Sequence, residues 1–226
     1  ALRAWAHFEL TRMFGQQYEA GIDNTQLAVP LILIPTLAFG DNVDVTRNTV
    51  EECYNQVITD LTEAESLLPE SNDVFINKYT AAALLARVYL QKADYAAARD
   101  AADRVIASGD YELNGTYAEC FAQDDPTDED IFSAENSELD NSNVMVTYFA
   151  INDFGGRADI EIEESHLALY DDLDARKAMF FVDGDATFTS KFNNEFGNLS
   201  IIRLAEMYLI RAECNSRLGT AIGAEP

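Results

Sequence analysis

The sequence predicts a mainly α-helical fold of tetratricopeptide-like helical hairpins, with a loop-rich insertion that contains short strands. Two observations support this fold class. First, the pattern L-A-x-x-Y-L occurs at residues 85–90 and again at residues 204–209, and the first copy lies in two amphipathic segments joined by a short turn, as in an αα-hairpin. Second, the helical period fades between residues 110 and 199, where Asn, Asp, Ser and Gly are frequent.

The first two helices are predicted at residues 1–14 and 50–68. The first ends at Gly15, a residue type that commonly stops helices, and a loop follows over residues 16–46. In the second helix, Thr49 and Glu52 have the spacing of a capping box, apolar residues recur at steps of three and four, and Pro69 ends the pattern. The apolar face of the first helix is expected to contain Leu2, Trp5, Ala6, Phe8, Met13 and Phe14.

An αα-hairpin is predicted next, with helices at residues 80–92 and 95–108, a tight turn at Ala93 and Asp94, and a stop at Gly109. Small residues on the facing sides let the two helices approach closely, and tyrosines fill the space beside them. The positions expected to form the scaffold, in this hairpin and in the second copy of the pattern, are Leu85, Ala86, Tyr89, Tyr95, Ala98, Leu204, Ala205 and Tyr208.

The remaining segments are less regular. Short strands are predicted at residues 129–135 and 144–149, a partly helical stretch at 166–181, and a last helix at 201–218 that ends at Gly219. We expect a single domain over residues 1–226, with a helical scaffold at 1–109 and 200–219 and an irregular insertion at 110–199. Residue 1 lies inside a predicted helix, and a single repeat helix cannot bury its apolar face alone, so truncation at both ends is expected.

The composition excludes several classes of partner and site. The chain carries 15 Lys and Arg against 40 Asp and Glu, a net charge of −25, which repels nucleic acids and anionic lipid headgroups; solubility is the plain reason for such a charge. Cys53, Cys120 and Cys214 are odd in number and have no CxxC spacing, so neither a disulfide framework nor a zinc site is predicted. The only histidines, His7 and His166, stand far apart.

Residues 124–130 are the densest acidic cluster in the chain. Oxygen-rich loops can bind Ca²⁺, but the spacing here does not fit an EF-hand, and a solvated acidic loop is the alternative. The candidate calcium ligands are Asp124, Asp125, Asp128 and Asp130. The sequence contains neither G-x-S-x-G nor H-E-x-x-H, so we expect a protein that is not an enzyme and needs no cofactor. A pair of glycosidase carboxylates stays open by counting alone.

Eight phrases in chain order resemble the SusD/RagB family. The most specific is I-R-L-A-E-M-Y-L-I-R-A-E at residues 202–213, which is similar to the family phrase "ilRlAEmyLiRAE". The helix predicted at 50–68, with Leu68 and Pro69 at its end, resembles "tveevY…I..DL..A..lLP". The other phrases that match lie at residues 2–15, 29–31, 81–98, 106–113, 170–176 and 190–192.

This resemblance implies a nutrient-binding lipoprotein of the outer membrane of Bacteroidetes, facing the cell surface and active in polysaccharide utilisation. Such proteins capture a glycan or oligosaccharide, or in some cases a peptide, for a SusC-like TonB-dependent transporter. The lipid anchor, which is the membrane attachment that the family implies, is absent from this chain. In this family the helices form the scaffold that docks on the transporter, and the irregular loops carry the ligand site.

Glycan binding needs aromatic faces that stack on sugar rings, and polar groups that bind hydroxyls. The loop residues of this kind, for each of which packing within the protein is the alternative role, are Phe39, Tyr117, Tyr148, Phe149, Asn152, Asp153 and Phe154. The alternative function is a tetratricopeptide-type adaptor that holds a partner protein or peptide carboxylates in a basic groove. Its candidate cations are Arg87, Lys92, Arg99 and Arg104.

Overall fold

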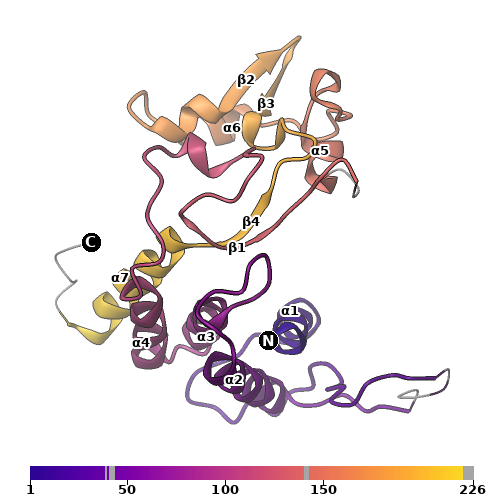
Figure 1. The fold of residues 1–226 in the computed structure, drawn as a ribbon, viewed down its shortest axis with the longest axis vertical. Coiled ribbons are helices and arrows are strands. Elements are labelled where there is room, and N and C mark those ends of the chain that lie inside the picture. The colour runs from indigo at the N-terminus through magenta and orange to yellow at the C-terminus, as the bar shows by residue number, and fades with distance from the viewer. Residues whose placement is uncertain (39, 41–43, 140–142, 221–226) are drawn as a thin grey trace. The chain divides into compact units, whose positions relative to one another are not determined.

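The computed structural model describes residues 1–38, 40, 44–139 and 143–220, and it confirms the mainly α-helical fold class (Figure 1). The chain forms two compact units. Unit 1 comprises residues 1–108 together with the chain from residue 206 onward, and unit 2 comprises residues 109–205. Within the described ranges, no helix has both the length and the apolar character needed to cross a membrane.

Unit 1 is built from helices that pack against their neighbours in chain order. These are α1 (Leu2–Phe14), α2 (Val50–Leu67), α3 (Lys78–Gln91) and α4 (Tyr95–Ile106), joined by α7 (Leu204–Leu218) after the chain returns from unit 2. Alanines allow the close approach of α3 and α4, because Ala86, Ala98 and Ala102 are all fully buried. The predicted hairpin and its turn are therefore confirmed, with Ala93 in the left-handed region at a φ of 57°.

Side-chain caps set the starts of α2 and α3. The capping box predicted at Thr49 is present, since its hydroxyl accepts from the amide of Glu52 and the Glu52 carboxylate accepts from the amide of Thr49. Helix α3 begins two residues earlier than predicted. Asn77 is its N-cap, and the amide of Thr80 donates to Asn77 Oδ1 at 2.8 Å. Thr80, expected as the first helical residue, is therefore the third residue of a second capping box.

The buried face of α1 differs from the prediction. Of the six apolar residues expected there, only Phe8 is buried, while Leu2, Met13 and Phe14 are exposed. The other inward positions hold Ala4, His7 and Thr11. Two of these are polar, but each has a hydrogen-bond partner: the Thr11 hydroxyl donates to the carbonyl of His7, and His7 Nε2 accepts from the amide of Ile32. Local partners therefore decided which face packs inward.

Gly15 ends α1 as predicted, but by close approach and not by a left-handed turn. Its φ is −91°, a value that any residue adopts. A Cβ at this position would lie 2.7 Å from the carbonyl oxygen of Thr11 and 3.0 Å from the Cβ of Ala28. Only glycine leaves room for the loop that crosses the end of the helix here.

The two copies of the L-A-x-x-Y-L pattern occupy different places in their helices, but they meet. The first copy lies in the second half of α3, whereas the second begins with Leu204, the first residue of α7. The third residues of the two copies form a bidentate ion pair: Arg87 Nε lies 2.5 Å from Glu206 Oε1, and Arg87 Nη2 lies 2.6 Å from Glu206 Oε2. Equivalent positions of the repeated pattern therefore join α3 to α7.

The scaffold positions differ in burial. Leu85, Ala86, Ala98 and Leu204 are buried, whereas Ala205 and the three tyrosines at positions 89, 95 and 208 are half-buried. The guanidinium of Arg217 lies 5.5 Å from the ring centre of Tyr95, and Arg211 lies over Tyr208. The tyrosines therefore seat arginine side chains as well as filling space between helices.

Unit 2 contains two antiparallel strand pairs. Strand β1 (Asp130–Ala134) pairs with β4 (Leu199–Arg203), and β2 (Phe180–Asp183) pairs with β3 (Ala186–Thr189). The strand predicted at 129–135 is confirmed as β1. The helix predicted at 201–218 is wrong for residues 201–203, which belong to β4. Ile202 there is buried opposite Phe132 of β1, and β-branched residues pack well in such a pairing.

The strand predicted at residues 144–149 is also wrong, because this segment is the helix α5 (Val144–Phe149). Asn143 Oδ1 accepts from the amide of Met145 and caps the helix, and Val146 is its buried residue. Tertiary packing here overrides the strand preference of valine, threonine and aromatic residues. The stretch 166–181 is partly helical as predicted, with α6 (Glu164–Leu167) and η3 (Ala175–Met179), but Phe180 and Phe181 belong to β2.

Candidate functional site

The ligand candidates that the structure describes all lie in unit 2, on short helical turns. Tyr117 precedes the turn η1 (Ala118–Cys120), and Tyr148 and Phe149 end α5. Asn152, Asp153 and Phe154 make up the turn η2 (Asn152–Phe154). Phe39 lies outside the described residues.

The chain after η2 folds back along the end of α5. The amide of Arg157 donates to the carbonyl of Thr147 and the amide of Asp159 to the carbonyl of Tyr148, each at 3.0 Å. Gly156 makes this return possible, because a Cβ there would lie 2.0 Å from the carbonyl oxygen of Ala150. These bonds satisfy the last carbonyls of α5, which a helix end otherwise leaves without partners.

Four candidates on this turn are exposed, and we call them the α5–η2 platform: Tyr148, Asn152, Asp153 and Phe154. Tyr148 is 43% exposed and Phe154 is 40% exposed. The guanidinium of Arg157, itself paired with Asp159, lies 5.1 Å from the centre of the Tyr148 ring.

Phe154 meets Phe181 edge to face, with ring centres 6.4 Å apart. Each aromatic ring of the platform is therefore supported on one side by a neighbour while much of its surface stays open to solvent.

The other two candidates, Tyr117 and Phe149, are half-buried, and the turn η4 (Ser190–Phe192) connects their surroundings. Phe149 packs on Phe192 with ring centres 5.1 Å apart. Lys191 Nζ lies 5.3 Å from the ring centre of Tyr117 and 4.7 Å from that of Phe121. Arg203 covers Phe121 as well, with its guanidinium carbon 5.4 Å from the ring centre.

We call Tyr117, Phe121, Lys191 and Arg203 the cation–aromatic cluster. Sequence reasoning missed Phe121, Lys191 and Arg203 as candidates. Lys191 and Arg203 lie in phrases that resemble the family, but no spacing in the sequence shows that they meet residues about 70 positions earlier in the chain.

Two of the four calcium candidates are engaged in hydrogen bonds that fasten their own loop. Asp130 Oδ2 accepts from the amide of Thr127 at 2.8 Å, and Asp124 Oδ1 accepts from the side-chain amide of Asn194 at 2.7 Å. In the part of the chain that the structure describes, no three His, Cys, Asp or Glu side chains are arranged to hold a metal ion. These observations favour a structural role for Asp124 and Asp130.

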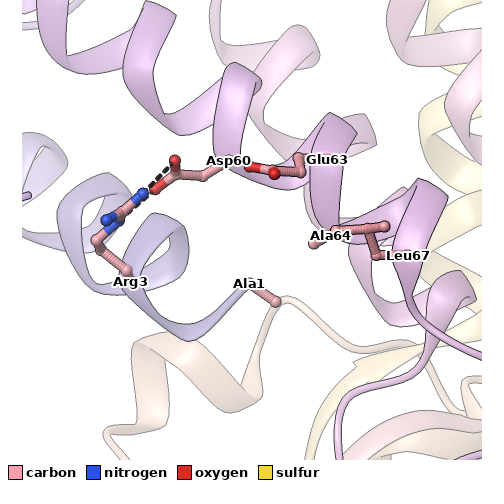
Figure 2. Close-up of a pocket in the computed structure, with 6 residues that line it drawn as sticks. All are labelled: Ala1, Arg3, Asp60, Glu63, Ala64 and Leu67. Atoms are coloured by element: carbon pink, nitrogen blue, oxygen red, sulfur yellow. Dashed lines mark hydrogen bonds and ion pairs between the residues drawn. The ribbon is translucent and has the colours of Figure 1, made fainter.

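Two pockets occur in unit 1, and neither is lined by a ligand candidate. The first, of about 290 Å³, lies between α1 and α2, and Figure 2 shows its lining residues Ala1, Arg3, Asp60, Glu63, Ala64 and Leu67. The second, of about 540 Å³, is lined by Glu9, Arg12, Arg87, Leu90, Gln91 and Glu206. Every arginine in these two linings is ion-paired with a carboxylate of the same pocket, so their charges already have partners.

The first pocket predicts a pH-dependent contribution to stability. Arg3 donates two hydrogen bonds of 2.7 Å to Asp60, which is 8% exposed, and this contact holds the pKa of Asp60 below its ordinary value. A lowered folded-state pKa stabilises the protein above the unfolded pKa, and this stabilisation is lost as pH falls through the folded value. Because Arg3 is about half exposed, we expect Arg3→Leu to cost about 1–2 kcal/mol at neutral pH.

The measurement is urea denaturation of the wild type and Arg3→Leu between neutral pH and about pH 3, near and below the ordinary pKa of aspartate. The difference in unfolding free energy between the two proteins should shrink as the pH falls. Arg99→Leu is the control, because Arg99 pairs only with the adjacent Asp100 on the surface of α4. A difference that stays constant over this pH range would contradict the role assigned to Asp60.

The remaining titratable groups are held in packing or hydrogen bonds. Burial lowers the pKa of His7, whose Nε2 accepts from a backbone amide. Burial also raises the pKa of the Cys120 thiol, which donates to Glu129 Oε2 at 3.4 Å. A thiol with a raised pKa is a poor nucleophile at neutral pH. His166 lies 3.1 Å from the Tyr170 hydroxyl, at an exposed position.

Comparison with known proteins gives consistent matches. Residues 1–90 match the family model SusD-like_3, described as "Starch-binding associating with outer membrane". A curated relative, SusD-like protein P38 of Formosa agariphila, is 32% identical over 114 residues, which cover 50% of this chain and 20% of the relative.

Solved structures share the fold over nearly the whole chain. A SusD superfamily protein from Bacteroides vulgatus matches with a TM-score of 0.82 and 28% identity, covering 97% of this chain and 53% of the other. A structure determined with a xylogluco-oligosaccharide shares the fold at a TM-score of 0.73 and 21% identity, covering 94% of this chain and 52% of the other. The chain thus spans about half the length of these structures and a fifth of the curated relative.

Proposed function

The chain belongs to the SusD/RagB family, and from that premise we propose that it is a non-catalytic glycan-binding protein. Its family model is described by starch binding at the outer membrane, and one protein of the same fold was solved with an oligosaccharide. In the full-length protein, we propose a lipid anchor at the cell surface and delivery of the bound glycan to a SusC-like TonB-dependent transporter.

The observation that carries glycan binding is the α5–η2 platform. Tyr148 and Phe154 present exposed aromatic surface, and Asn152 and Asp153 are exposed beside them in sequence. Sugar rings carry C–H faces that stack on aromatic rings, while their hydroxyls bond to amides and carboxylates. Support from Arg157 and Phe181 holds the rings in place before the ligand arrives, which reduces the entropy lost on binding.

The proposed mechanism is reversible binding followed by handover, with no bond made or broken and no cofactor. The ligand remains chemically unchanged. Residues Tyr117 and Phe149 support the platform region from half-buried positions, through Phe121 and Phe192. The net charge of −25 disfavours nucleic acids as partners.

The adaptor alternative loses its cations in the structure. Arg87 is paired with Glu206, Lys92 with Glu51, Arg99 with Asp100 and Arg104 with Glu65. A groove that grips peptide carboxylates needs cations whose charge is not already met by the protein. The four side chains proposed for that role instead tie helices together or lie on the surface of one.

The test of glycan binding is affinity electrophoresis of the full-length protein against a panel of neutral and acidic polysaccharides, followed by calorimetry on the best ligand. Tyr148→Ala and Phe154→Ala are each expected to weaken binding about tenfold, the loss of one stacking contact. Phe75→Ala is the matched control, because Phe75 is an exposed aromatic residue of unit 1 that lines neither pocket.

Two results would contradict the proposal. The first is no binding by the wild-type protein to any member of the panel. The second is binding that neither platform variant weakens more than the control does, which would place the ligand elsewhere. Circular dichroism should confirm that all three variants keep the helical content of the wild type.

A further inference from the structure

Nearly every cation of this chain is neutralised by one of its own carboxylates. Of the 15 Lys and Arg residues, all but Arg47 and Lys191 form an ion pair with Asp or Glu. Arg47 donates instead to the backbone carbonyls of Leu27 and Ala28. Lys191 is therefore the single cation whose ammonium group meets neither a carboxylate nor a carbonyl among the described residues.

Lys191 is held in place on both sides. Its own amide donates to the Thr189 hydroxyl at 3.3 Å, which caps the turn η4. The next residue, Phe192, packs on Phe149 of α5. The ammonium group is therefore set over the rings of Tyr117 and Phe121, at 5.3 and 4.7 Å from their centres.

The neighbouring cations do not share this situation. Arg203, on the same Phe121 ring, has its charge met by Glu129, whose side chain is 4% exposed and lies 3.6 Å away. Arg176, whose charge is close enough to influence Tyr117, is bidentate with Asp174. Ring quadrupoles attract a cation but do not cancel its charge. Lys191 thus keeps a half-buried positive charge with three donors and no anion.

We propose that Lys191 recognises an anionic substituent of the glycan, a carboxylate or a sulfate ester, while the Tyr117 ring contacts the sugar that carries it. This inference rests on the proposed glycan binding and names the ligand class. A chain with a net charge of −25 repels acidic polysaccharides in general. An acidic glycan therefore needs a local, uncompensated cation beside an aromatic ring, and the cation–aromatic cluster supplies one.

The substitution Lys191→Met separates this role from a structural one. Methionine keeps an unbranched apolar side chain against the two rings but removes the charge. Lys191→Arg keeps the charge and the cation–π contact. If Lys191 served packing alone, Lys191→Met would change neutral and acidic glycan binding to the same degree.

The experiment measures binding of the full-length protein to polygalacturonate, to a sulfated carrageenan, and to xyloglucan and starch as neutral glycans. We expect the wild type to bind at least one acidic polymer. Lys191→Met should weaken that binding about tenfold, the loss of one charge-assisted contact, while the melting temperature and any neutral binding stay unchanged. Lys191→Arg should retain most of the affinity. The two acidic polymers distinguish a carboxylate ligand from a sulfate ligand.

A comparison on the wild type alone covers the case in which Lys191→Met fails to fold. Fully methyl-esterified polygalacturonate lacks the charge but keeps the sugar, so it should bind at least about tenfold more weakly than polygalacturonate if the ligand is a carboxylate. Desulfated carrageenan serves the same purpose for the sulfate arm. Binding only to neutral glycans, or equal binding to the charged and uncharged forms, would overturn this inference and leave glycan binding standing. No binding to any glycan would overturn the proposed function itself.

Discussion

Replacing Arg87 with glutamate is expected to lower the free energy of unfolding by about 3 kcal/mol. Arg87 makes two hydrogen bonds of 2.5 and 2.6 Å to Glu206, and their side chains are only 21% and 32% exposed. The reversal places two carboxylates against each other in a setting where neither is well hydrated. The cost lies at the lower end of that for breaking a buried pair, because both groups keep some contact with water.

The reciprocal variant makes this prediction specific. Exchanging the two charges in Arg87→Glu with Glu206→Arg should recover most of the stability lost in either single variant, as measured by urea denaturation in a double-mutant cycle. Arg99→Glu is the control, since its pair with Asp100 lies within one helix, and it should cost little. Losses that simply add in the double variant would show that the α3 to α7 contact contributes no coupling.

The second large effect is expected at Gly156, where Gly156→Val should destabilise unit 2 by about 3 kcal/mol. A Cβ there would lie 2.0 Å from the carbonyl oxygen of Ala150 and 2.6 Å from that of Val146. Both contacts are with backbone, so no side-chain rotation can relieve them. The segment that folds back on α5 must move away, and it carries Arg157 off the Tyr148 ring.

Thermal unfolding and glycan binding together test this prediction. Gly156→Val should lower the melting temperature and weaken binding at the α5–η2 platform in the same protein. Gly115→Ala is the matched control, because a Cβ at Gly115 meets only the flexible carboxylate of Glu119, at 3.3 Å. If Gly156→Val keeps both wild-type stability and wild-type affinity, the fold-back does not support the platform.

The candidate site was predicted in part. Sequence reasoning chose loop aromatics with polar neighbours, and the structure puts Tyr148, Asn152, Asp153 and Phe154 on one exposed turn. It did not find Lys191, because a single lysine in an acidic chain carries no pattern. What singles out Lys191 is the absence of a carboxylate partner among the described residues, and only a three-dimensional arrangement shows which carboxylates are near.

Where the sequence misled, long-range packing decided the outcome. Residues 144–149 combine valine, threonine and aromatic residues, yet they form α5 because Asn143 caps them and residues 157–159 bond to the end of the helix. Ile201 and Ile202 continue the apolar pattern of α7, yet they form β4 because β1 pairs with them. On α1, partners for His7 and Thr11 outweighed the burial of larger apolar residues.

The sequence by itself determined the features that depend on residues a few positions apart: the capping box at Thr49, the hairpin of α3 and α4 with its turn at Ala93, and the stop at Gly219. Only the tertiary structure decided that the repeated pattern joins α3 to α7 through Arg87 and Glu206, and that Lys191 stands over Tyr117. The physical reason is range: capping and turn geometry are set within one helical turn, whereas an ion pair or a ring contact depends on which distant segments the packed core brings together.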